Sequence, residues 1–247
     1  MAVAHFNQDY PVLVDNLLQQ MSEDDAMARA VGAPPGTFMR YAHKERLILE
    51  QYGFEPSDAI VDIGCGAGRL AAALSDTHRG IYAGFDIVDK LVEYADRRFG
   101  GDNFHFFTCD GLDIPLDGRT ADFMTFFSVF THLHHEETFI YLQEAMRVLR
   151  PGGTLVCSYL DFEENWPVFE ATVAARHNGT QVHANVFMNA DIIRRLVEGA
   201  GFDVVAVHPP HTPFIQVPQL IEIRGEESLP AGPSAMGQGI CVARTPS

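Results

Sequence analysis

The stretch that decides the fold reads Val61-Asp62-Ile63-Gly64-Cys65-Gly66-Ala67-Gly68-Arg69-Leu70. It continues a short apolar run at residues 59–63, which predicts a strand, and it opens a predicted helix at residues 69–75. Glycines let the backbone turn sharply and approach a ligand without Cβ clashes, and the amides at a helix start favour polar or anionic groups. The stretch therefore predicts a ligand-binding loop between a strand and a helix, with a plain tight turn as the alternative.

Outward from this loop, short apolar runs alternate with helical patterns. Further helices are predicted at 88–99, 136–149 and 189–199, the last capped by Asn189. The predicted strands lie at 59–63, 81–85, 104–108, 121–127, 154–160, 202–207 and 239–243. This alternation is typical of βαβ units, so we predict an α/β fold with a mostly parallel sheet, helices on both faces, and ligands at the carboxyl ends of the strands.

Three segments lie outside the alternation. Residues 1–57 contain helical patterns, so we expect an N-terminal helical lid or extension ahead of a main domain at 58–247. Two insertions, 161–188 and 209–237, are long enough to serve as lids or substrate walls. Three aromatic side chains of the first insertion either cover a ligand or pack the insertion onto the core. These are Phe162, Trp166 and Phe169.

Acidic residues accompany the loop. A dinucleotide site requires the spacing G-x-G-x-x-G, whereas this loop reads G-x-G-x-G with Arg69 in the place of the third glycine. Asp86 ends the next strand, 20 residues after Gly66, where a carboxylate can accept both hydroxyls of a ribose; a helix cap is the alternative. Asp110 follows the third strand, where it can accept a hydrogen bond from an exocyclic amine, although Asp-Gly is also a common turn.

Together these motifs resemble those of the class I methyltransferases that use S-adenosylmethionine (SAM). The matching segments are residues 61–68, Gly84-Phe85-Asp86-Ile87, Cys109-Asp110-Gly111 and Arg147-Val148-Leu149-Arg150-Pro151-Gly152-Gly153. The resemblance implies a Rossmann-like sheet of seven strands whose last strand is antiparallel. It also implies SAM as the cofactor and S-adenosylhomocysteine as its product.

The resemblance assigns the glycine loop to the methionine and ribose of SAM. Gly64, Gly66 and Gly68, with Cys65 between them, are expected to pass beneath these groups. Asp62, two residues before the first glycine, is expected to help hold the methionine ammonium.

The resemblance assigns the later motifs to contacts with the adenosine of SAM. The resemblance implies that Asp86 binds the ribose hydroxyls and that Ile87 packs on the adenine. Asp110 is expected to meet the adenine amine, with Gly111 and Leu112 beside it.

The segment after the fourth strand is expected to meet the reacting groups. Phe127 and Ser128 correspond to positions near the methionine and the sulfonium. Because histidine can take up a proton near neutral pH, His132 is our first candidate for a general base that activates an alcohol; a helix cap or a surface position is the alternative. The run from His132 to Glu137 could also be interpreted as a metal site, but Glu136 and Glu137 suit the first turn of a helix, so no metal is predicted.

The acceptor is less constrained. A finer resemblance of Ser128-Val129-Phe130-Thr131-His132-Leu133 to bacterial methyltransferases associated with polysaccharide or glycosyl transfer suggests a hydroxyl of a sugar or small metabolite. N- or C-methylation of a natural product and SAM binding without catalysis remain alternatives. The glycine spacing and the lack of a Tyr-x-x-x-Lys pair argue against an oxidoreductase that uses NAD.

Composition limits the partners. Asp and Glu outnumber Lys and Arg by 33 to 17, which gives a formal charge of −16, so neither nucleic acid nor an anionic membrane is an expected partner. No signal peptide or membrane-spanning run is evident, which favours the cytoplasm, and the four separated cysteines predict free thiols. The expected partner is a small-molecule acceptor; a homodimer is left open.

Overall fold

The computed structural model describes residues 6–179 and 184–247, with side chains from residue 10 onward. Contacts divide the chain into two compact units. The first unit consists of residues up to 110 together with 213–234, and the second of residues 111–212 together with 235–247. The expected boundary at residue 57 stays a prediction, although the N-terminal helices belong to the same unit as the glycine loop.

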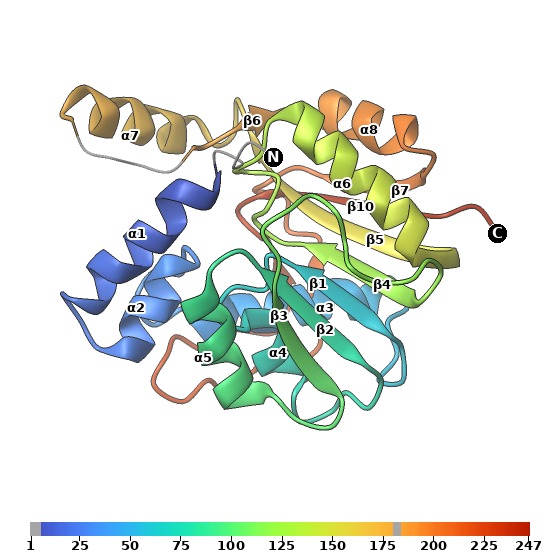
Figure 1. The fold of residues 1–247 in the computed structure, drawn as a ribbon, viewed down its shortest axis with the longest axis horizontal. Helices are drawn as coiled ribbons and strands as arrows, with labels where there is room; N and C mark the ends of the chain where they lie inside the picture. The colour runs from blue at the N-terminus through green and yellow to red at the C-terminus, as the bar shows by residue number, and fades with distance from the viewer. Residues whose placement is uncertain (1–5, 180–183) are drawn as a thin grey trace. The chain divides into compact units, whose positions relative to one another are not determined.

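The first unit contains a parallel sheet in the order β3-β2-β1. Its strands are β1 (Ile60–Ile63), β2 (Tyr82–Asp86) and β3 (Phe104–Thr108). All four residues of β1 are buried, including the carboxylate of Asp62 among three apolar side chains. The strands are joined through α4 (Arg69–Leu74) and α5 (Asp89–Phe99), and α5 lies along β2 and β3 (Figure 1).

Three helices precede β1. They are α1 (Phe6–Leu18), α2 (Glu23–Ala30) and α3 (Phe38–Gln51). The side chain of Ser22 accepts the amide of Asp25 and so caps α2. Buried side chains of α1 and α2, among them Val14 and Met27, form an apolar cluster with Ala67 of the glycine loop and Val88. The N-terminal helices therefore pack against the loop that the sequence singled out.

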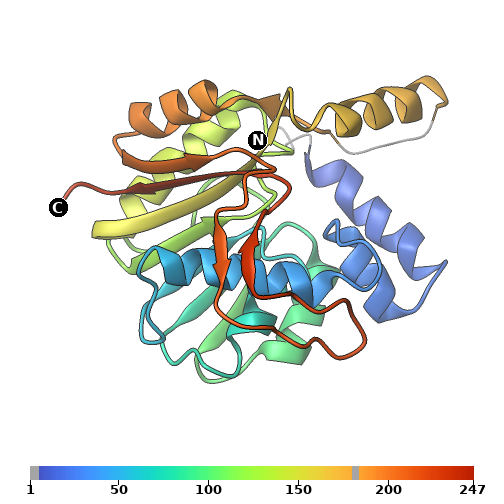
Figure 2. The same cartoon turned by 180° about the vertical axis from the view of Figure 1, so that it is seen from behind.

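The expected insertion at 209–237 contributes a small hairpin to the first unit. Strands β8 (Ile215–Val217) and β9 (Gly232–Ser234) pair antiparallel, and β8 lies against α3 (Figure 2). Gln51 donates to the carbonyl of Phe214 over 3.2 Å and accepts the amide of Gln216 over 2.6 Å. The part of this segment around β8 is thus bound to α3.

The second unit contains the strand order β4-β5-β10-β7, with β6 paired to β5. The strands are β4 (Ala121–Phe126), β5 (Leu149–Asp161), β6 (Phe187–Met188), β7 (Asp203–His208) and β10 (Gly239–Arg244). β4 and β5 are parallel, whereas β10 is antiparallel to both of its neighbours. With the short strand β6 the sheet has eight strands, one more than the seven predicted, and the last strand is antiparallel as expected.

Three helices belong to the second unit. α6 (His135–Val148) and α8 (Ala190–Gly199) pack on its sheet and on each other (Figure 1). Glu136 and Glu137 occupy the first turn of α6, and Asn189 caps α8 by accepting the amide of Ile192, both as predicted. α7 (Trp166–His177) lies in the first insertion and was not predicted. The α/β fold class is confirmed.

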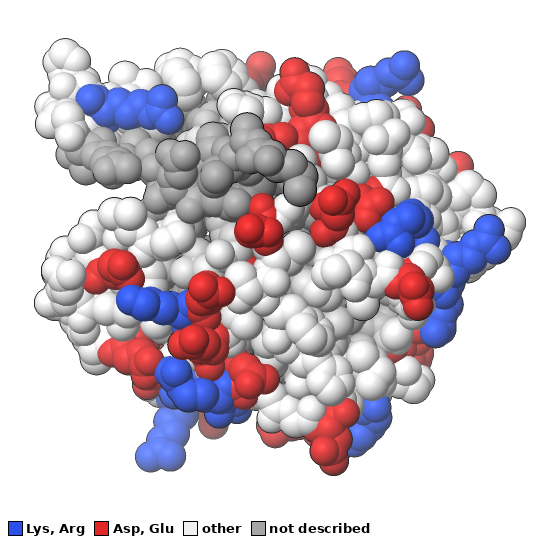
Figure 3. Space-filling model, viewed as in Figure 1, with Lys and Arg blue, Asp and Glu red and all other residues white. Residues whose placement is uncertain are grey.

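The surface charges, the cysteines and the length of the helices can be compared with what the composition predicted. On the face shown in Figure 3, Lys and Arg lie interspersed among Asp and Glu. The four cysteines are free, as predicted, and Cys65, Cys157 and Cys241 are buried. In the described part of the chain, no helix is both long and apolar enough to cross a membrane.

Candidate functional site

The glycine loop between β1 and α4 presents mainly backbone. Gly64, Gly66 and Gly68 have φ values of 70°, 55° and 77°, in the left-handed region that favours glycine. The two side chains between them, Cys65 and Ala67, are buried. The amides of these three glycines are bonded within the protein, so the loop offers a ligand a close approach to its backbone rather than free amides, which fits the methionine and ribose of SAM.

Asp86, at the end of β2, is attached to this loop. Its Oδ2 accepts the amide of Gly66 over 2.9 Å, and its Oδ1 accepts the amide of Val88 over 3.0 Å. Burial raises the pKa of Asp86, and these amides counteract the rise because they favour the ionised form. A carboxylate oxygen has more than one acceptor position, so both oxygens can still accept ribose hydroxyls. The bond to the loop was not predicted.

Asp62 is almost completely buried in β1. Its Oδ2 accepts the hydroxyl of Tyr82 over 2.6 Å. Burial and the nearby Asp62 raise the pKa of Tyr82, so its hydroxyl stays a donor at neutral pH. Asp62 is thus bound to Tyr82 of the neighbouring strand, and its expected role at the methionine ammonium stays a prediction.

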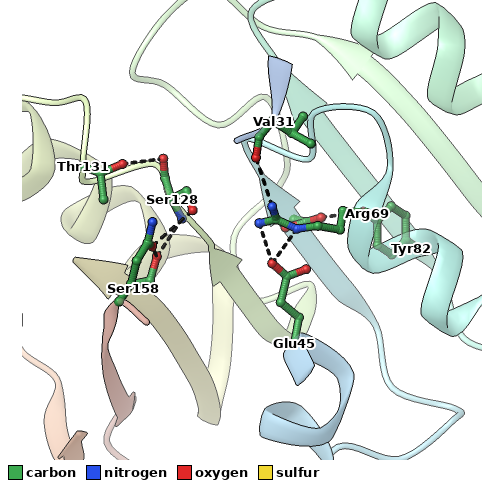
Figure 4. Close-up of polar contacts among 9 residues, drawn as sticks. Val31, Glu45, Arg69, Tyr82, Ser128, Thr131 and Ser158 are labelled. Carbon is green, nitrogen blue, oxygen red and sulfur yellow. Dashed lines mark hydrogen bonds and ion pairs between the residues drawn. The ribbon is translucent and has the colours of Figure 1, made fainter. Parts of the chain in front are cut away.

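A buried ion pair joins the N-terminal helices to the loop. Arg69, the first residue of α4, lies 2.5 Å from Glu45 of α3 and donates to the carbonyl of Val31 over 3.1 Å (Figure 4). Glu45 is 1% exposed. The side chain of Val31 lies so close to Gly66 that a Cβ there would approach it to 2.4 Å. Sequence reasoning assigned no role to Glu45 or Val31, because their contacts join distant segments.

Tyr10 of α1 is a further residue that the sequence did not indicate. It packs with Ile87 against the apolar cluster, and both burial and the Asp86 carboxylate raise its pKa. Phe38 packs on the same cluster. Helix α1 therefore brings a protonated phenol close to the expected ribose position.

The second unit carries a hydrogen-bonded loop after β4. Ser128 has a φ of 62°, which is unusual for a residue other than glycine and is often found at functional sites. Its amide donates to the hydroxyl of Ser158 over 2.7 Å, and both serine hydroxyls donate to the Oε1 of Gln238. Thr131 closes the turn by donating to the carbonyl of Ser128 (Figure 4). The neighbouring Phe127 is buried.

His132 follows this turn and is held by its ring. Its Nδ1 lies 2.7 Å from the carbonyl oxygen of Ala184, and the amide of Val186 donates to the carbonyl of Thr131. Because a carbonyl can only accept, Nδ1 carries the proton and Nε2 is the basic nitrogen of the neutral ring. His134, by contrast, is the N-cap of α6, and its amide donates to Glu137.

The remaining predicted positions lie at the start of the second unit or next to it. Asp110 is exposed, whereas Gly111 and Leu112 are half-buried. The carbonyl of Gly111 accepts the hydroxyl of Tyr141 over 2.9 Å. Among the described residues, no group of three or more His, Cys, Asp or Glu side chains is placed to hold a metal ion.

Comparison with known proteins identifies the domain that contains the loop. Residues 60–153, which include the glycine loop, Asp86 and the Ser128 turn, match the model of a methyltransferase domain. Residues 60–153 are a class I SAM-dependent methyltransferase domain. SAM is the cofactor of this family, and the residues around the loop fit it.

Relatives and solved structures extend the comparison. An O-methyltransferase of Pyrenophora dematioidea is 28% identical over 64% of this chain and 59% of its own length. A ubiquinone/menaquinone biosynthesis C-methyltransferase of Desulfotalea psychrophila is 27% identical over 45% of each chain. The matched part of the chain thus spans only about half the length of these relatives.

The structure of magnesium protoporphyrin IX methyltransferase from Synechocystis, with bound S-adenosylhomocysteine, has the same fold. Its TM-score is 0.61 at 18% identity, and the match covers 96% of this chain and all of the other.

Proposed function

We propose that this protein transfers the methyl group of SAM to a hydroxyl oxygen of a small-molecule acceptor. The observation that carries the proposal is the left-handed glycine loop, whose Gly66 amide is held by Asp86. SAM supplies an activated methyl group when it is bound, and the protein aligns the acceptor and removes its proton.

The residues of the first unit hold the cofactor in this proposal. Gly64, Gly66 and Gly68 lie beneath its methionine and ribose, and Asp86 accepts the ribose hydroxyls. Ile87 packs on the adenine, with Asp110 at the adenine amine. Asp62 acts from behind the loop. Cys65 is buried and serves to shape the turn.

The candidate general base belongs to the second unit. His132 takes the acceptor proton at Nε2, because its Nδ1 proton is bound to Ala184. The resemblance also assigns Gly111, Leu112, Phe127 and Ser128 to cofactor contacts. Oxygen is favoured as the acceptor atom because the fungal relative is named an O-methyltransferase and because an alcohol benefits from a base. C-methylation is the second candidate, since another relative is named a C-methyltransferase.

The test is methyl transfer from labelled SAM to a panel of alcohols, phenols, amines and activated carbon acids. We expect O-methylated products, and His132→Ala should lower turnover by about 10²- to 10⁴-fold while SAM affinity stays the same. His134→Ala is the matched control, because the backbone amide of His134 keeps its bond to Glu137, and its turnover should not change. SAM binding without transfer to any acceptor would leave only the non-catalytic alternative, and full turnover by His132→Ala would remove His132 as the base.

A further inference from the structure

Four aromatic side chains of the second unit contact one another around the start of α7. We call Phe162, Trp166, Phe169 and Phe187 the aromatic cradle. The ring centroids of Trp166 and Phe169 lie 4.9 Å apart, and Phe162 lies 5.5 Å from Trp166 in a T-shaped arrangement. Phe187 contacts Phe162 at 6.1 Å and Phe169 at 5.6 Å. These are ordinary distances for aromatic pairs, so the rings form one cluster.

The cradle is unusual because it is open. Phe162 and Trp166 are 43% and 42% exposed, and α7 has no buried residue among those described. Two large aromatic side chains at adjacent surface positions leave an apolar patch that folding alone does not explain. Contacts of Phe162 and Phe169 with Phe187 pack the insertion onto β6, but Phe162 and Trp166 keep a large exposed fraction that this packing does not use.

The cradle lies next to the loop that carries His132. Phe162 directly follows β5, and Ser128 lies beyond the end of β4; since β4 and β5 are parallel, both positions lie at the same edge of this sheet. The segment that leads into Phe187 holds this loop: Ala184 accepts from His132, and Val186 donates to Thr131. The same short segment, residues 184–187, therefore contacts the candidate base and contributes Phe187 to the cradle.

The charged side chains around the cradle limit the class of ligand that it can bind. Acidic residues flank the cradle at Asp161, Glu163, Glu164 and Glu170, and the basic residues of α7, Arg176 and His177, lie at its far end. Carboxylates near an apolar surface repel anionic ligands and disfavour phosphorylated or carboxylated compounds. The site therefore fits a flat, apolar ligand without negative charge.

We propose that the aromatic cradle binds the ring of an uncharged phenolic methyl acceptor. This inference rests on the proposed function, since it takes the ligand to be the methyl acceptor, and it narrows the acceptor from a general hydroxyl compound to an aromatic one. Ring stacking and edge contacts to Trp166 and Phe162 supply the affinity, and the acidic rim supplies the selectivity.

The chain offers a direct probe, because Trp166 is its only tryptophan. We would titrate the protein, without SAM, with 4-hydroxyacetophenone and record tryptophan fluorescence. Saturable quenching is expected with this uncharged phenol. Binding of 4-hydroxybenzoate, which adds a carboxylate, and of methyl glucoside, which lacks an aromatic ring, should each be about tenfold weaker or more.

Substitutions can distinguish a loss of phenol binding at the cradle from a general effect on folding. By calorimetry, Trp166→Ala should weaken phenol binding about tenfold, and Trp166→Phe should restore most of it. Val173→Ala, at a half-exposed position of the same helix outside the cradle, should bind like the wild type. None of these changes should alter SAM affinity.

The outcomes distinguish this inference from the proposed function. Saturable phenol binding that depends on Trp166, together with methyl transfer to the phenol, is the expected result. Methyl transfer to a sugar or aliphatic alcohol without phenol binding would overturn the cradle assignment and leave the proposed function intact. Phenol binding at Trp166 without transfer to any acceptor would support the ring site and contradict the proposed function.

Discussion

At Gly66, three distant parts of the first unit meet at one residue. The amide donates to Asp86, the absent side chain leaves room for Val31, and the neighbouring Arg69 binds Glu45. Glycine spacing and the acidic residue at the end of β2 predicted the loop and Asp86, because both are local signals. Val31, Glu45 and Tyr10 could not be found in this way, since each reaches the loop only through tertiary packing.

Glu45 gives the first unit a predictable pH dependence. Burial raises its pKa to about 7, although Arg69 pulls it down. Between the ordinary pKa of 4.5 and about 7, the folded protein holds this proton more tightly than the unfolded chain does. The free energy of unfolding should therefore fall as pH rises through this interval, by up to about 3 kcal/mol.

Glu45→Gln removes this titration and keeps an oxygen that can accept from Arg69. Its free energy of unfolding, measured by urea denaturation across the same pH interval, should depend less on pH than that of the wild type. If both proteins have the same slope, Glu45 does not titrate as described.

At the scale of elements, regular patterns predicted most of the fold. Helices with one apolar face and strands buried on both faces were located to within a few residues, as for β1 at Ile60–Ile63. Helix α7 was missed because it buries no face among the described residues and so lacks an apolar stripe. The strands β8 and β9 were missed because three-residue strands, one of them containing Pro233, carry almost no pattern.

The N-terminus of α3 is capped by a residue that is distant in the sequence. The own N-cap of α3, Thr37, forms no side-chain cap bond among the described residues, whereas Glu226 accepts the amides of Met39 and Arg40 over 2.9 and 3.3 Å. Glu226→Ala should lower the free energy of unfolding by about 0.5–2 kcal/mol. Glu222→Ala, an exposed change in the same segment, is the control, and equal stability of the two variants in urea would show that Glu226 is not a cap.

At the scale of the whole molecule, the charge of −16 sets the expected partners. Acidic and basic side chains are mixed on the face in Figure 3, and the net charge repels phosphate backbones. We therefore expect no tRNA binding in gel-shift or anisotropy measurements, even at low salt, where attraction to a basic patch would be strongest. Binding that weakens steeply with added salt would reveal such a patch and contradict the expectation.

Every proposal for this chain requires that the glycine loop and Asp86 hold the adenosyl group of SAM. Calorimetric titration with SAM tests this directly, with circular dichroism to verify that each variant is folded. The wild type should bind one SAM per chain, and Asp86→Ala should bind about 10- to 100-fold more weakly because charged hydrogen bonds to the ribose are lost. Asp89→Ala, an exposed carboxylate change three residues away, should bind normally. Equal SAM affinity of the wild type and Asp86→Ala would contradict the account.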